Sequence, residues 1–104
     1  MKIIKIADKE YAVKYSINSL IEMEQYLGQP FTKIFSEGGV SLLTLRTLVY
    51  FGMKQMNKDL THEKAGEIIS DALESGKTFD ELILLFAEEL NKSLGVKDNP
   101  ETKN

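Results

Sequence analysis

The sequence predicts an α+β fold, mostly α, with an N-terminal β-hairpin followed by about four helices packed around one core. Apolar and polar residues alternate over the first 15 positions, which is the pattern of half-buried strands. From residue 17 onward, apolar residues recur at helical spacing between capping signals. The chain has 104 residues, of which 42% are hydrophobic and 28% charged. These values fit one globular domain, expected over residues 1–95, followed by a disordered polar tail over residues 96–104.

The predicted hairpin consists of two alternating runs separated by a polar break. The residues expected on its inner face are Ile4, Ile6, Tyr11, Val13 and Tyr15. A two-stranded ribbon is only marginally stable alone. It must therefore pack on the helices or pair with the edge of a neighbour.

The first helix is expected from about Ile17 to Leu27, because Ser16 is a favourable N-cap and Gly28 suits the left-handed position that ends many helices. Pro30 then breaks the chain, because proline disfavours helix in the residue before it. The apolar residues of the segment Phe31–Phe35 indicate a short helical turn.

Three longer helices follow. They are expected over about Ser41–Asn57, between Thr61 and Gly76, and from Thr78 to Gly95. The last one opens with a capping box, in which Thr78 and Glu81 satisfy each other's free backbone donors.

The helix expected at 41–57 has more apolar surface than a core-facing stripe requires. Its predicted core face contains Leu42, Leu45, Leu48, Val49, Met53 and Met56. Leu43 and Tyr50 fall on the opposite side and Phe51 on a flank, while Leu84 points away from the core face of the last helix. Either the hairpin and the Phe31–Phe35 turn cover these side chains, or they form a surface for self-association or for a partner protein. The pattern leaves both interpretations open.

The residues do not assemble a recognisable catalytic, metal or cofactor site. Cysteine is absent, so disulfides and thiolate ligands are excluded. His62 is the only histidine and is expected to be an exposed residue at a helix start. Glu24 falls within an apolar sector, and we expect it to pair with Arg46, the only arginine; a catalytic carboxylate is the alternative. The loop at Gly38–Gly39 gives only a weak signal for anion binding.

Charge and hydropathy limit the partners. The net charge is −3 and no basic stripe gathers on one predicted helix, so nucleic acid is not an expected partner. The longest apolar run, Leu82–Ala87, is too short to cross a bilayer, so we expect no membrane association and a cytoplasmic location.

The order of elements resembles a known family. A hairpin ending in Tyr11–Tyr15 precedes a capped helix that contains Leu20–Glu24 and closes at Leu27–Gly28, and a Leu-rich helix ends in Leu48–Met53. In this order the chain resembles the tail assembly chaperones of long-tailed bacteriophages and prophages, including the related proteins of gene transfer agents. The resemblance spans about residues 3 to 95.

The resemblance implies a non-enzymatic helical protein with a small N-terminal β element, acting in the cytoplasm of the bacterial host. Such proteins bind the tape measure protein during tail assembly, tend to form homo-oligomers, and are often also made in a longer, frameshifted form. Two other classes of function remain open. One is a different protein-interaction module, such as a regulator or an antitoxin-like adaptor. The other is a small enzyme or ligand-binding domain with a pocket near Glu24 or His62.

Overall fold

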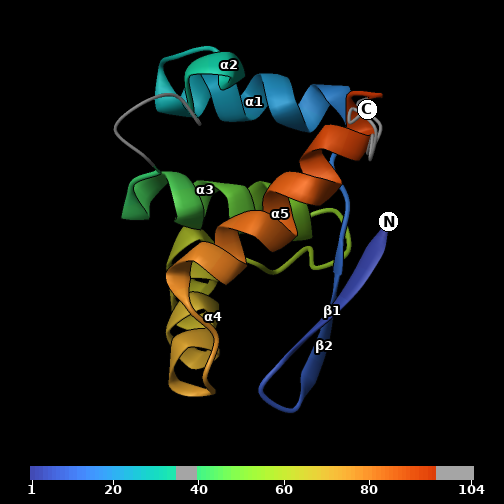
Figure 1. Ribbon diagram of the computed structural model, residues 1–104. Helices are drawn as coiled ribbons and strands as arrows, with labels where there is room; N and C mark the ends of the chain where they lie inside the picture. Colours follow the sequence, from blue (N-terminus) through green and yellow to red (C-terminus); the bar gives the residue numbers. More distant parts are fainter. Residues whose placement is uncertain (35–39, 96–104) are drawn as a thin grey trace, which may run out of the picture.

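A computed structural model describes residues 1–34 and 40–95 of the chain. It contains an antiparallel hairpin followed by five helices (Figure 1). The elements are β1 (Lys2–Ile6), β2 (Lys9–Val13), α1 (Ile17–Leu27), α2 (Phe31–Ile34), α3 (Leu42–Met53), α4 (His62–Glu74) and α5 (Phe79–Ser93). The predicted α+β, mostly α, fold is confirmed, and α2 is the short turn expected after Pro30. The predictions for Phe35, for the glycine loop at 36–39 and for the tail at 96–104 fall outside the described residues.

Helix α3 lies at the centre of the molecule. It packs against α1, α4, α5 and β2. Figure 1 shows α1 and α2 on one side of α3, α4 on the other, and α5 crossing in front. Its inner side chains Leu45, Leu48 and Met53 are fully buried. The central position of α3 therefore explains most of its apolar character, since a helix that is apolar on several sides is normally buried on several sides.

The hairpin is attached to α3 through a close approach at Gly52. Strand residues Ile4 and Tyr11 are paired in the antiparallel register. Beyond the strand, the Lys14 amide donates to the Gly52 carbonyl at 2.7 Å, and the Tyr15 hydroxyl donates to the Leu48 carbonyl at 2.6 Å. Burial raises the pKa of Tyr15 well above its ordinary value, and the nearby Glu89 charge adds to this effect. Tyr15 therefore stays neutral and keeps its donor.

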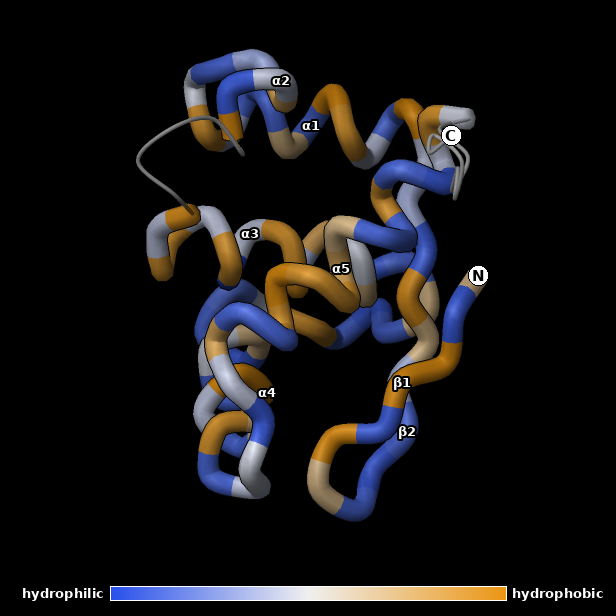
Figure 2. The backbone as a smooth tube through the Cα atoms, in the orientation of Figure 1, coloured by the Kyte–Doolittle hydropathy of each residue, from blue (hydrophilic) through white to orange (hydrophobic). Residues whose placement is uncertain are grey.

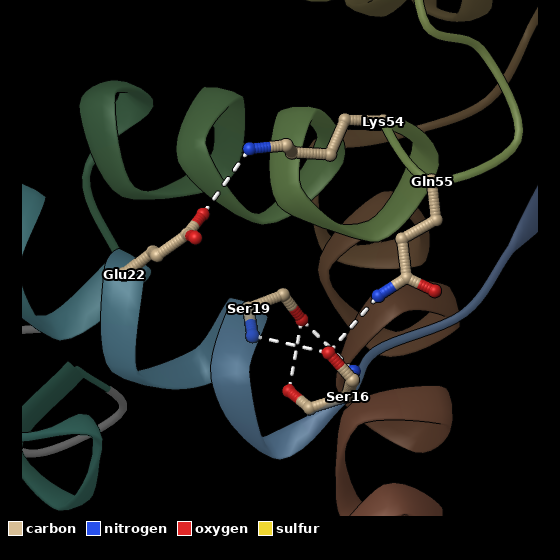
Figure 3. Close-up of polar contacts among 5 residues, drawn as sticks. All are labelled: Ser16, Ser19, Glu22, Lys54 and Gln55. Carbon is tan, nitrogen blue, oxygen red and sulfur yellow. Dashed lines mark hydrogen bonds and ion pairs between the residues drawn. The ribbon is translucent and has the colours of Figure 1, made fainter.

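A second polar contact joins the start of α1 to the end of α3 (Figure 3). Ser16 and Ser19 exchange hydrogen bonds as a capping box, with the Ser19 amide donating to Ser16 Oγ at 3.1 Å. Gln55 Nε2 donates to the same Ser16 oxygen at 3.0 Å. Nearby, Lys54 Nζ pairs with Glu22 at 3.1 Å. These contacts fix α1 across α3, although the exposed ion pair itself adds little stability.

The predicted core face of α3 is wrong at its two ends. Leu42 is 70% exposed and Met56 is 51% exposed. Leu42 is the first residue of the helix, and α3 ends at Met53, before the expected Asn57, so Met56 lies beyond it. Thr47 is buried instead. Its hydroxyl tolerates burial because it donates a hydrogen bond to the Leu43 carbonyl at 2.7 Å.

Candidate protein-binding surface

An apolar groove of about 430 Å³ lies between the start of α3 and the middle of α4. Its lining residues are Leu42, Leu43, Arg46, Gly66, Ile69, Ser70 and Leu73. Two helical patterns create it. Leu42, Leu43 and Arg46 occupy the first turns of α3, while Ile69 and Leu73 are one turn apart on α4. The groove is therefore formed by two helices that the core holds side by side.

The groove leaves leucine side chains in water. Leu43 is 50% exposed and Leu73 is 41% exposed. Figure 2 shows the first turn of α3 as a strongly apolar stretch at the edge of the molecule. Across from it, Gly66 carries no side chain, and a Cβ there would lie 3.6 Å from Arg46 Cδ. The surface is apolar with one cation, which suits the apolar face of a protein helix.

Leu84 lies on a different surface. It is 59% exposed on α5 and does not line the groove between α3 and α4. Asp80 and Glu88, one turn before and one turn after Leu84, are both exposed. Of the four candidate interface residues, Leu43 and Leu84 are exposed, but the fold places them on separate surfaces.

Phe51 is not part of an exposed surface, and this prediction is wrong. The side chain is only 5% exposed because it fills the core next to an aromatic cluster. Its ring meets Tyr50 edge-on at 4.9 Å and Tyr26 of α1 at 6.3 Å. Tyr50 is partly buried, and its ring also contacts His62 and Lys54, whose Nζ atom lies 5.4 Å from the ring centre.

His62 begins α4 as predicted, but it is partly buried rather than exposed, because its ring packs against Tyr26 and Tyr50. Its imidazole stacks on Tyr50 at 3.9 Å and on Tyr26 at 4.6 Å, with ring planes within 21° and 12° of parallel. Its Nδ1 atom is buried and has no hydrogen-bond partner among the described residues. Burial lowers the pKa of His62, and the positive charges of Arg46 and Lys54 lower it further. The histidine is therefore a neutral packing residue at pH 7.

Glu24 and Arg46 do not form the ion pair expected from the sequence. Glu24 Oε2 instead accepts a hydrogen bond from the Phe31 amide at 2.8 Å, at the start of α2. The reversal at Gly28, which has a left-handed φ of 74°, brings the chain back to this carboxylate. Arg46 Nη2 donates to the Tyr26 hydroxyl at 3.4 Å. The Glu24 carboxylate therefore has a structural role, because it accepts a hydrogen bond from a backbone N–H that has no partner within the helix.

Two further features of the described residues 1–34 and 40–95 concern metal binding and a buried acid. No three His, Asp or Glu side chains in these ranges are grouped to hold a metal ion. Glu89 is buried on α5, although its position among the acids of that helix suggested a solvated face, and its Oε2 pairs with the Met1 amino group at 3.2 Å. None of the described helices has the length and apolar character needed to cross a membrane.

Comparison of the chain with models of known protein families, with curated proteins and with solved structures finds no match.

Proposed function

We propose that the chain is a non-enzymatic tail assembly chaperone of a long-tailed phage or prophage, which self-associates and binds the tape measure protein in the bacterial cytoplasm. The observation that carries this proposal is the leucine-lined groove between α3 and α4. The resemblance in element order supplies the identity of the client.

The groove suits a helical client. An amphipathic helix binds by placing side chains at i, i+3, i+4 and i+7 into an apolar groove. Leu42, Leu43 and Leu73 present that apolar surface here. A tape measure protein is long, helix-rich and prone to aggregation, so a chaperone must cover many apolar helix faces in succession.

The rest of the surface fits a solubilising coat. The net charge is −3, and exposed acids such as Asp80, Glu81 and Glu88 lie on the outer face of α5. Net charge away from zero opposes association and precipitation. His62 and Glu24, the residues nearest to an enzymatic interpretation, are engaged in packing and in capping α2.

Co-expression with the client tests this function. The gene is expected to lie upstream of a long reading frame rich in coiled-coil heptads, and the chain should keep fragments of that protein in the soluble fraction. Leu43→Glu places a charge in the groove at a half-exposed position, so it should abolish co-purification while circular dichroism stays unchanged.

Ile17→Glu is the matched control, since Ile17 is 55% exposed at the start of α1 and away from the groove. This variant should bind the client as wild type does. Fragments that remain insoluble with the wild-type chain, or that co-purify equally with Leu43→Glu, would argue against the proposal.

A further inference from the structure

The cation in the groove, Arg46, has no acidic partner among the described residues. Arg46 Nε is buried and makes no hydrogen bond with any described residue, and Nη2 reaches only the Tyr26 hydroxyl at 3.4 Å. Arg46 forms none of the ion pairs found in the described part of the chain. A partly buried guanidinium without an acid has lost hydration and gained little in return. An occupant that brings a carboxylate to this point would supply the missing partner.

The outer face of α5 offers such a carboxylate next to an apolar side chain. Leu84 is 59% exposed, and Asp80 lies one helical turn before it. Within the described residues Asp80 has no ion pair and no side-chain hydrogen bond, whereas Glu88 on the other side is held by Lys2 at 3.1 Å. The face therefore combines an exposed leucine with an acid that no other described residue pairs with.

The spacings on the two surfaces match. Leu43 and Arg46 are three residues apart on α3, and Asp80 and Leu84 are four residues apart on α5. Both separations place the side chains about 5–6 Å apart on one helix face. A leucine from α5 that lies against Leu43 can therefore bring its neighbouring acid to the guanidinium of Arg46.

We propose that, when no client is bound, the occupant of the groove is a second copy of this chain, with Leu84 inserted between α3 and α4 and Asp80 paired with Arg46. This deepens the self-association part of the proposed function by naming its contact. The groove belongs to α3 and α4 and the inserted face to α5, so the two sides of the contact are different surfaces. Such heterologous contacts link copies in succession into rings or extended arrays.

Charge exchange between two variants tests the pairing in the absence of any client. Arg46→Glu alone sets two carboxylates against each other across the contact, and Asp80→Lys alone sets two cations against each other. Each variant should need at least about tenfold more protein than wild type to associate in sedimentation velocity. An equimolar mixture contains one wild-type and one inverted pairing, so it should associate at a concentration within about threefold of wild type.

A second pair of variants guards against misfolding at Arg46. Leu43 and Leu84 are both at least half exposed, so Leu43→Glu and Leu84→Lys should each keep the fold yet fail to associate. Their mixture should associate again through the new Glu–Lys contact. Asp71→Lys is the control, because it makes the same charge change as Asp80→Lys on the side of α4 that lines another groove. It should associate as wild type does.

A wild-type chain that stays monomeric at all concentrations overturns the inference. So do variants that associate as wild type does, and mixtures that do not recover association. The client experiment is read separately. If the variant mixtures do not regain association but the chain still binds the tape measure fragment, only this inference is wrong. If the mixtures regain association but the chain does not bind the fragment, only the chaperone role is wrong.

Discussion

At the scale of single residues, the contact between Tyr15 and Gly52 attaches the hairpin to the helices. A Cβ at Gly52 would lie 2.7 Å from the Tyr15 hydroxyl oxygen and 3.2 Å from Val13 Cγ1. Both neighbours are buried, so neither can move away without loss of packing. Glycine is required at this position by the space available, since the backbone there is ordinary helix.

Gly52→Ala should therefore lower the free energy of unfolding by about 1–3 kcal/mol, as overpacking in a core does. Gly66→Ala is the matched control, because a Cβ on Gly66 meets only Arg46 Cδ at an ordinary 3.6 Å. Alanine in place of this helical glycine should raise the free energy of unfolding by about 0.5–1 kcal/mol. Urea denaturation of both variants checks the difference, and equal effects would contradict the close approach at Gly52.

His62 should make stability depend on pH. Its pKa is lowered in the folded chain, first by burial and then by Arg46 and Lys54, so the unfolded chain binds a proton more readily. The stabilisation from the neutral ring is complete above the unfolded pKa of 6.5 and is lost as the pH falls below it.

Thermal melts at pH 7.5 and 5.5 should show this loss in wild type and a smaller loss in His62→Phe, which keeps a ring that can stack on Tyr26 and Tyr50. An identical pH dependence in the two proteins would show that His62 does not titrate in this way.

At the scale of elements, capping signals predicted the helices well because they are local. Ser16, Thr61 and Thr78 each accept a hydrogen bond from the backbone three residues later, as a helix N-cap does. The partner of Glu24 was not predicted correctly, since it depends on how the chain returns after Pro30. The resulting bond to the Phe31 amide connects α1 to α2.

Glu24→Ala should lower the free energy of unfolding by about 1 kcal/mol, because it removes the acceptor of a free N–H at a helix start. Glu24→Gln keeps an acceptor oxygen and should lose less. The two variants can be compared by urea denaturation, with hydrogen exchange at the Phe31 amide as a local readout. Exchange at Phe31 that is unchanged in Glu24→Ala would contradict the capping role.

Helical periodicity identified the sides of α3 but not what covers them. It placed Phe51 on a flank, and the fold covers that flank with Tyr26 from α1 and His62 from α4. It placed Leu42 on the core side, yet this first residue of the helix is 70% exposed, whereas Leu45 one turn later is fully buried. The sequence shows which faces of α3 are apolar. Which other elements pack on those faces depends on segments that are distant in the chain.

At the scale of the whole molecule, the fold divides the surplus apolar residues between the core and two surfaces. The sequence placed Leu43 and Leu84 away from the predicted core faces, but it did not indicate that Leu42 and Leu73 join Leu43 in one groove. That groove requires α3 and α4 to lie side by side, which no local pattern specifies. Arg46 was predicted to form an ion pair with Glu24. Because Arg46 forms no ion pair with any described residue, its positive charge remains available in the groove.

Hydrogen–deuterium exchange of the full chain tests the central claim that this groove binds protein helices of the tail. The measurement compares the chain alone, at a concentration where it is monomeric, with the chain plus a soluble fragment of the tape measure protein encoded beside it. We expect added protection at residues 42–46 and 66–73, with the hairpin unchanged. Protection confined to the hairpin or to α1, or no change at saturating fragment, would contradict it.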